Sequence, residues 1–340
     1  MNVKLTNVIN KLYGIRVAKS RVVREGFLSR NHVLFSKNDK YFLKQYRFSD
    51  KNKIAEIHRV KRLFAENGIP VILPLRNKKH FTYFRFEGNY YALFPFVGGK
   101  KLSSRQLSVK ALRSAGAMLA DMHVINKNKP PIRLENRFEP WNKKEFLVKA
   151  KKILIIVERK KSKSSFDRLA IKTLKGKIAL AEKNTVRFED LNLKNDHVTH
   201  GDYHENNMFF DDNDTIAWVF DFEKAKLAPR VVEVVRSAVL ICFDGKFTPK
   251  NFKRAAEYLR AYSKIYPLKQ VEVRDGMKAF SFKHLHSLWV ETEHYLKHNR
   301  RVDKFIKTDL DEYDFVDRNS EKLISLFTDP AGDSISETYS

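Results

Sequence analysis

Apolar residues in the first hundred positions recur with two different periods. Three segments alternate or run apolar in the manner of β-strands, namely SRVVREGFLS, NHVLFS and KYFLKQY, and SKND forms a turn between the last two. From Lys51 to Glu66 the apolar positions recur at helical spacing, and Asn67-Gly68 ends that helix. Two more strands, HFTYFRF and YYALFPFV, flank the hairpin signal EGN. The pattern predicts three strands, one helix and two strands.

The pattern changes at Gly98-Gly99. Beyond this point it predicts helices over about 107–123, 140–160, 165–184, 230–242, 249–264, 272–298 and 309–327, with a strand-rich stretch at 197–223. The last residues, 331–340, form a polar tail. We therefore expect a strand-rich N-terminal lobe over 1–97 and a mainly helical C-terminal lobe over 98–330.

The charge of the chain is large and uneven. The 340 residues carry a formal net charge of +26, and residues 1–190 hold 44 Lys and Arg against 15 Asp and Glu. Such a basic half could bind nucleic acid, an acidic partner or anionic lipid. No RNA-binding motif with interleaved aromatic residues accompanies the charge, so we favour solvated lysines and argue against a nucleic-acid partner.

Cysteine usage and hydropathy indicate the compartment. Cys242 is the single cysteine, which excludes an internal disulfide and a cysteine-based zinc cluster. The N-terminal residues hold no apolar run typical of a signal peptide, and no run reaches the roughly 18 apolar residues of a membrane helix. These features predict a soluble, cytoplasmic protein with no membrane partner.

The stretch HGDYHENNMFFDDNDTIAWVFDFE, from His200 to Glu223, concentrates candidate chemistry. Read as a turn followed by a strand hairpin, it brings Asp202, Asn207 and Asp221 to one end of a small sheet. Phosphoryl transfer needs metal ions on the phosphate oxygens and a group that orients the attacking hydroxyl. Oxygens from an Asn and an Asp suit Mg²⁺, and the second Asp can accept the hydroxyl proton.

This stretch resembles the signature of the aminoglycoside phosphotransferase and choline kinase group, small-molecule kinases with the protein-kinase fold. The resemblance implies that Asp202 is the catalytic base and that Asn207 and Asp221 bind metal. Glu223 is similar to a third acidic position of choline-kinase-like members, which implies a contact to metal through water. Within the same motif, His200 and His204 are expected to support the loop or face the substrate.

The resemblance extends upstream. YFLKQY is similar to the strand whose lysine holds the nucleotide phosphates, which implies that role for Lys44, and Glu56 is the best-placed partner carboxylate on the following helix. GFLSRNHVLF resembles the phosphate-covering loop and LFPFVGG the adenine-binding hinge. These two segments imply ATP contacts from Ser29, Arg30, Asn31, Pro95, Phe96 and Val97. Because proline has no N–H, the hinge donor is expected at Val97 or its neighbour.

Together these features predict an α+β, two-lobed, protein-kinase-like fold that uses ATP and Mg²⁺. The expected reaction transfers the γ-phosphoryl group to a hydroxyl of a small molecule, such as a sugar, an amino alcohol or a homoserine-like metabolite, with an aminoglycoside as a further alternative. A Ser/Thr protein kinase is disfavoured because no APE-like segment follows DFE and HGD replaces HRD. A non-catalytic binding module is disfavoured because Lys44, Asp202, Asn207 and Asp221 are all present.

Overall fold

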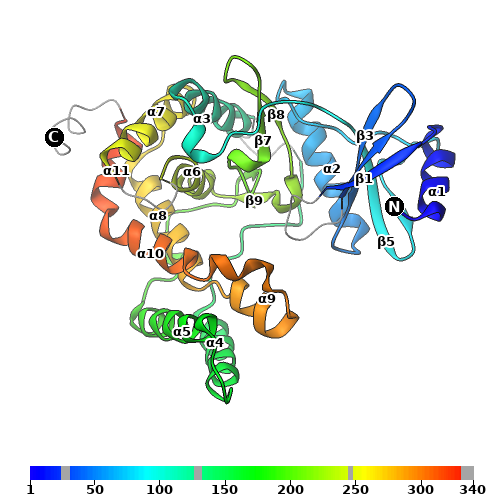
Figure 1. Cartoon of the computed structure of the whole chain (residues 1–340). Coiled ribbons are helices and arrows are strands. Elements are labelled where there is room, and N and C mark those ends of the chain that lie inside the picture. Colours follow the sequence, from blue (N-terminus) through cyan, green and yellow to red (C-terminus); the bar gives the residue numbers. More distant parts are fainter. Residues whose placement is uncertain (24–30, 126–131, 244–247, 331–340) are drawn as a thin grey trace. The chain divides into compact units, whose positions relative to one another are not determined.

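The computed structural model of the chain describes residues 1–23, 31–125, 132–243 and 248–330 (Figure 1). The chain forms two compact units that interleave along the sequence. Unit 1 comprises residues 1–103, 131–136 and 200–225, and unit 2 comprises 104–130, 137–199 and 226–340. In the described ranges, no helix is both long and apolar enough to cross a bilayer. The division into an N-terminal lobe over 1–97 and a C-terminal lobe over 98–330, which the sequence predicts, remains a prediction.

Unit 1 is built around a five-stranded antiparallel sheet of order β1-β2-β3-β5-β4. Its regular elements are α1 (Val3–Tyr13), β1 (Lys19–Val23), β2 (Asn31–Phe35), β3 (Lys40–Gln45), α2 (Lys51–Glu66), β4 (Phe84–Phe86), β5 (Asn89–Pro95), η3 (Glu205–Asn207), β7 (Met208–Phe210), β8 (Ile216–Val219) and η4 (Phe222–Lys224). In the register of β3 with β5, Lys44 lies opposite Ala92.

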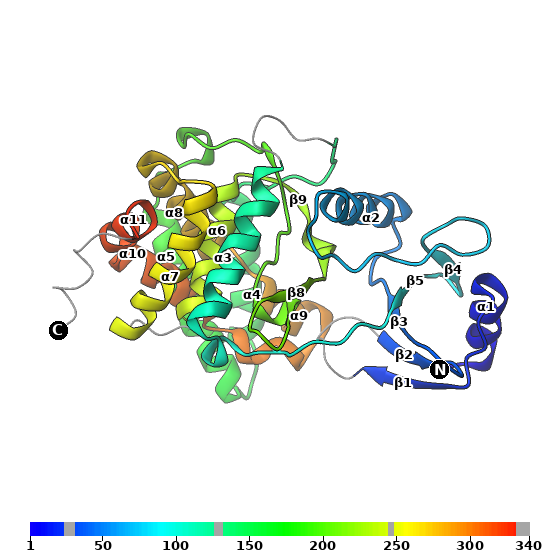
Figure 2. The same ribbon diagram turned by 90° about the horizontal axis from the view of Figure 1, so that it is seen from above.

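Alternation along β5 places the two helices of the sheet on opposite faces. Tyr91 and Leu93 pack with Leu5 and Ile9 of α1. Ala92 and Phe94 point to the other face, where the core includes Ile54 of α2. Figures 1 and 2 accordingly show α1 and α2 on the two sides of the sheet. The helix that carries Glu56 is thus held against the strand next to Lys44.

The hairpin of β7 and β8 belongs to unit 1, although more than a hundred residues separate it from β5. The N–H of Val219 donates to the carbonyl of Pro70 over 2.8 Å. The ring of Phe222 lies 5.6 Å, between centroids, from that of Phe64 on α2. These contacts place the acidic end of the hairpin beside the sheet and α2.

Unit 2 is mainly helical. Its elements are η1 (Ser104–Gln106), α3 (Val109–Val124), α4 (Lys143–Glu158), α5 (Ser165–Lys183), η2 (Phe188–Asp190), β6 (His197–Thr199), β9 (Lys226–Ala228), α6 (Arg230–Ala238), the π-helical turn η5 (Val239–Phe243), α7 (Pro249–Ile265), α8 (Gln270–Leu285), α9 (Trp289–Lys297), η6 (Arg300–Phe305), α10 (Thr308–Arg318) and α11 (Ser320–Thr328). Helices α3 and α7 lie side by side in both views (Figures 1 and 2). Gly116 of α3 allows this close approach, because a Cβ there would collide with the carbonyl of Tyr258.

The described elements differ from the sequence expectation in four places. Helix α1, with Asn2 as its N-cap and Gly14 as its C-cap, lies in a segment for which the sequence pattern predicts no element. The helices expected over 272–298 and 309–327 are each interrupted, at 286–288 and at Asn319. The strand expected over 80–86 is short and begins at Phe84.

Candidate active site

A tight turn follows β6 and leads toward the hairpin of β7 and β8. Gly201 has a φ of 77°, and a Cβ at this position would collide with the carbonyl of Lys224, so only glycine fits. His200 is completely buried beside it. Its Nδ1 accepts a hydrogen bond from the N–H of Asp202, so Nε2 carries the proton and donates to the carbonyl of Phe220 over 2.8 Å. His200 therefore ties the turn to the far strand of the hairpin.

Asp202 lies at the mouth of this turn with charged and polar groups around it. One carboxylate oxygen is 3.0 Å from the Nζ of Lys224, and the other is 3.8 Å from the Nε2 of His204. The side-chain nitrogen of Asn207 donates to the main-chain carbonyl of Asp202 over 2.9 Å and lies 3.2 Å from the Nε2 of His204. The loop thus holds Asp202, His204 and Asn207 together.

Asp221 faces the lysine of β3. Its Oδ1 is 2.7 Å from the Nζ of Lys44, and the same ammonium is 2.8 Å from Oε1 of Glu223. Burial favours a lower pKa for Lys44, but the carboxylates of Asp221 and Glu223 outweigh burial and raise it. Burial likewise favours a higher pKa for Asp221, yet the charge of Lys44 holds it below its usual value. Lys44 and Asp221 are therefore both charged at neutral pH.

Glu56 has different partners from those expected. Its Oε1 accepts hydrogen bonds from the main-chain N–H groups of Glu135, over 2.6 Å, and Asn136, over 3.3 Å. Lys44 pairs instead with Asp221 and Glu223, so the structure differs from the expected pair of Lys44 and Glu56. The physical reason is that Glu56, which is buried, satisfies two main-chain donors of a segment that joins unit 1 from far along the chain.

The other expected nucleotide contacts lie along the sheet. Asn31 opens β2, and its side-chain oxygen accepts from the N–H of Gln45 over 3.4 Å. Ser29 and Arg30 lie outside the described residues. At the end of β5, Pro95 has no N–H, and the N–H of Phe96 donates to the carbonyl of Lys40 over 3.2 Å. Among the described residues, Val97 is therefore the first residue of this segment whose main-chain N–H remains to bind a ligand.

The oxygens near the hairpin fit a magnesium ion. Asn207 uses its amide nitrogen within the loop, which leaves its Oδ1 for a cation. The side chain of Asp221 is 43% exposed and contacts Lys44 through one oxygen. Within the described ranges, no three His, Cys, Asp or Glu side chains gather into a metal cluster. Mg²⁺ commonly takes one or two carboxylates together with substrate phosphates, which matches this donor set.

Two charged residues of the site were not singled out from the sequence. Lys224 contacts Asp202, and the Nε of Arg47 lies 3.4 Å from Oε2 of Glu223. Lys224 follows directly after the DFE triplet, and Arg47 stands three residues after Lys44. This proximity to the motifs is the sequence feature that indicates a place for both residues near the site.

Comparisons with known proteins agree with this geometry. A family model described as the phosphotransferase enzyme family matches residues 20–278. A spectinomycin phosphotransferase solved with ADP and spectinomycin is 15% identical, with a TM-score of 0.61, over 92% of this chain and 93% of that one. A microcompartment-associated aminopropanol kinase is 12% identical, with a TM-score of 0.61, over 94% and 98%. A choline kinase from Cryptosporidium parvum is 14% identical, with a TM-score of 0.55, over 94% and 97%. A search of curated protein sequences gives no match.

The chain belongs to the phosphotransferase enzyme family. Membership confirms the resemblance drawn from the HGD and DFE motifs, and the structural neighbours confirm the kinase-like α+β fold. This family member is an ATP-dependent phosphotransferase that acts on hydroxyl groups of small molecules.

Proposed function

We propose that this phosphotransferase moves the γ-phosphoryl group of ATP, in the presence of Mg²⁺, to a hydroxyl of a sugar, an amino alcohol or a homoserine-like metabolite. One observation carries the proposal. The Nζ of Lys44 lies 2.7 Å from Asp221, across 177 residues of sequence, and Asp221 ends the hairpin that begins with Asp202 and Asn207. A cation, two acidic groups and an amide oxygen thus belong to one compact unit.

Each residue has a proposed part. Lys44 binds the phosphates of the nucleotide, and Asn207 and Asp221 hold the metal. Glu223 contacts the metal through water and also pairs with Lys44 over 2.8 Å. When bound, Mg²⁺ neutralises charge on the phosphate oxygens. Asp202 accepts the proton of the acceptor hydroxyl, and Lys224, 3.0 Å away, offsets the negative charge of its carboxylate.

The remaining nucleotide contacts are proposed along the sheet. The main chain at Pro95, Phe96 and Val97 binds adenine, with the N–H of Val97 as donor, and the loop that ends at Asn31 covers the phosphates together with Ser29 and Arg30. Glu56 acts on the site indirectly, because it holds the main chain at residues 135 and 136. We also propose a cytoplasmic location, where ATP is available, and no nucleic-acid partner.

The acceptor is found with a panel of alcohols. Purified protein is incubated with Mg·ATP and sugars, amino alcohols, homoserine or aminoglycosides, and phosphorylated product is detected by mass spectrometry. Amino alcohols belong in the panel because two structural neighbours are an aminopropanol kinase and a choline kinase.

Asp202→Asn is the matched inactive control. This variant should lower kcat by about three orders of magnitude, while ATP affinity stays within a few fold, because the base contacts the acceptor and not the nucleotide. A variant that keeps most of its turnover would remove Asp202 from the role of base.

A further inference from the structure

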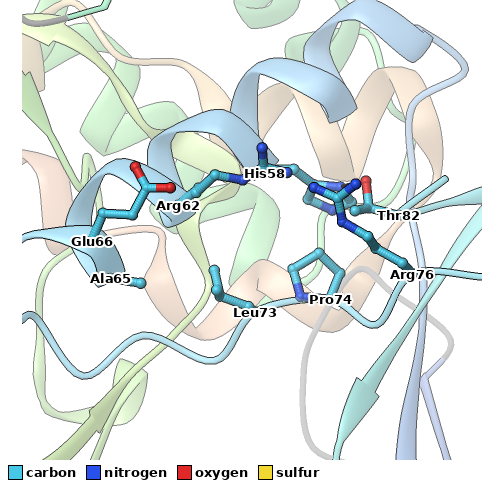
Figure 3. Close-up of a pocket in the computed structure, with 8 residues that line it drawn as sticks. All are labelled: His58, Arg62, Ala65, Glu66, Leu73, Pro74, Arg76 and Thr82. Atoms are coloured by element: carbon cyan, nitrogen blue, oxygen red, sulfur yellow. Dashed lines mark hydrogen bonds between the residues drawn. The ribbon is translucent and has the colours of Figure 1, made fainter. Parts of the chain in front are cut away.

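A pocket lies beside α2, and none of the residues of the β7-β8 hairpin line it. It has a volume of about 420 Å³ and is bounded by α2 and by the segment that leads into β4 (Figure 3). Its lining includes Arg62, Glu66, Arg76 and Thr82, but not Lys44, Asp202, Asn207 or Asp221. A cavity of this size accommodates a small metabolite.

One end of the pocket is cationic. Figure 3 shows the guanidinium group of Arg62, from α2, extending toward that of Arg76, from the segment between α2 and β4, which lies close to the hydroxyl of Thr82. Neither arginine forms an ion pair with a carboxylate of the described chain. Both arginines are exposed, and an anion bound between them can accept several charge-assisted N–H bonds.

A buried hydrogen-bond chain supports the hydroxyl at this end. Thr82 Oγ1 is 2.8 Å from Nδ1 of His58, whose Nε2 is 2.7 Å from the hydroxyl of Tyr46. Burial, reinforced by the positive charges of Lys61, Lys44 and Arg62, lowers the pKa of His58 to about 3, so the ring is neutral. When Tyr46 donates to Nε2, Nδ1–H donates to Thr82, and the Thr82 proton is then available to an anion in the pocket.

The other end of the pocket has the opposite charge. Glu66 lies one helical turn from Arg62, at the end of the pocket away from Arg76, and Leu73 and Pro74 form an apolar wall between the two ends (Figure 3). Glu66 has no ion-pair partner among the described residues either. A ligand that satisfies both ends carries an anionic group and a cationic group on a short carbon chain.

We propose that this pocket binds a small phosphate monoester that bears an amino group. The phosphate lies between Arg62 and Arg76 and accepts from Thr82, and the ammonium faces Glu66. The site does not depend on the chemistry at Asp202 and Asp221, so its test is a binding measurement and not an activity.

The probe is phosphoethanolamine, titrated calorimetrically into the full chain. Arg62→Gln and Arg76→Gln should each weaken its binding by about tenfold or more, because each removes charge-assisted hydrogen bonds to the phosphate. Arg59→Gln is the matched control, since Arg59 is an exposed residue of α2 that does not line the pocket. It should bind the probe as the unmodified protein does. Unchanged melting temperatures establish that the variants are folded.

A second arm tests the acidic end. 3-Phosphoglycerate places a carboxylate where phosphoethanolamine has an amine, so it should bind about tenfold more weakly, and Glu66→Gln should reduce this difference. The proposal is overturned if the unmodified protein does not bind phosphoethanolamine. It is also overturned if both arginine variants bind as tightly as the Arg59 control, which would place the phosphate at another site, such as the one at Lys44.

Discussion

Asp221 combines a functional charge with a backbone conformation that few residues adopt. Its φ and ψ of 65° and 59° lie in the left-handed region, where asparagine and aspartate are the best tolerated residues other than glycine. An exchange of Asp221 for Asn therefore removes the carboxylate charge and leaves the turn into η4 intact. This makes the metal site testable without loss of the fold.

Asp221→Asn should abolish the part of ATP binding that depends on Mg²⁺. Lys44→Ala should weaken ATP binding both with and without metal, because the role proposed for Lys44 is a direct contact to the phosphates. The measurement is calorimetric titration of ATP into each variant, in Mg²⁺ and in chelator. If the Asp221 variant binds Mg·ATP as tightly as the unmodified protein, Asp221 is not a metal ligand.

Lys61 should make the stability of the protein depend on pH. It is buried under the ring of Phe94, 4.4 Å from the ring centroid, and donates to the carbonyl of Ile72. Burial, followed by repulsion from Lys44, lowers the pKa of Lys61 from 10.5 to about 7. Between these two values the unfolded chain binds more protons than the folded one, so stability rises with pH and is lost as pH falls through about 7.

Lys61→Met should remove this dependence. The free energy of unfolding of the unmodified protein should rise by up to about 1.4 kcal/mol per pH unit from this group, and the variant should lack that rise and be the more stable at neutral pH. Urea unfolding between about pH 7 and 9 measures both effects. The control is Lys51→Met, at an exposed position of the same helix. Equal slopes for all three proteins would show that Lys61 keeps an ordinary pKa.

At the scale of elements, we expect alanine substitutions at two helical glycines of unit 2 to have opposite effects on stability. A Cβ at Gly116 of α3 would collide with the main chain of Tyr258 on α7, so Gly116→Ala should destabilise the protein by about 2–4 kcal/mol. A Cβ at Gly176 of α5 would meet only Leu310, at 3.6 Å. Gly176→Ala should therefore be neutral or stabilising by up to about 1 kcal/mol. Thermal unfolding of both variants compares them, and equal effects would contradict the packing of α3 on α7.

Local patterns account for most of the elements. The strand-helix-strand order of the sheet and the helix at 51–66 follow from periodicity and turn residues. The long helices expected at 272–298 and 309–327 break at 286–288 and Asn319, positions without proline or glycine, so tertiary packing decides those ends. Helix α1 has apolar residues at Leu5 and Ile9, but only the sheet that they cover explains their burial.

The candidate site depended more strongly on contacts that local patterns do not reveal. The short spacing from Asp202 to Asn207 lies within one loop and could be read directly. The contact of Lys44 with Asp221 spans 177 residues; the resemblance assigned both residues to one nucleotide site but paired Lys44 with Glu56. The sequence pattern could not predict the hydrogen bonds of Glu56 to the main chain at 135 and 136, because they depend on the position of a segment that is distant in the sequence.

At the scale of the whole molecule, the net charge of +26 should produce weak and salt-sensitive binding to polyanions. Binding of a labelled single-stranded DNA, followed by fluorescence anisotropy, should be detectable at low salt and vanish by about 150 mM salt. The reason is that exposed lysines contact the DNA only through its phosphates, and salt weakens such contacts by competing with the release of counterions from the DNA. Sub-micromolar affinity at that salt concentration would instead indicate a nucleic-acid partner.

The interleaving of unit 1 has a consequence for its synthesis. Residues 1–103 leave the ribosome well before residues 200–225, which complete the unit and carry Asp202, Asn207 and Asp221. At about 5–20 residues per second, translation of the intervening chain takes roughly 6–25 s after residue 103. During this delay the face of α2 and the loop that receive Val219 and Phe222 are uncovered. The nascent chain is therefore most exposed to chaperones and proteases in this interval, before Lys44 acquires its carboxylate partners.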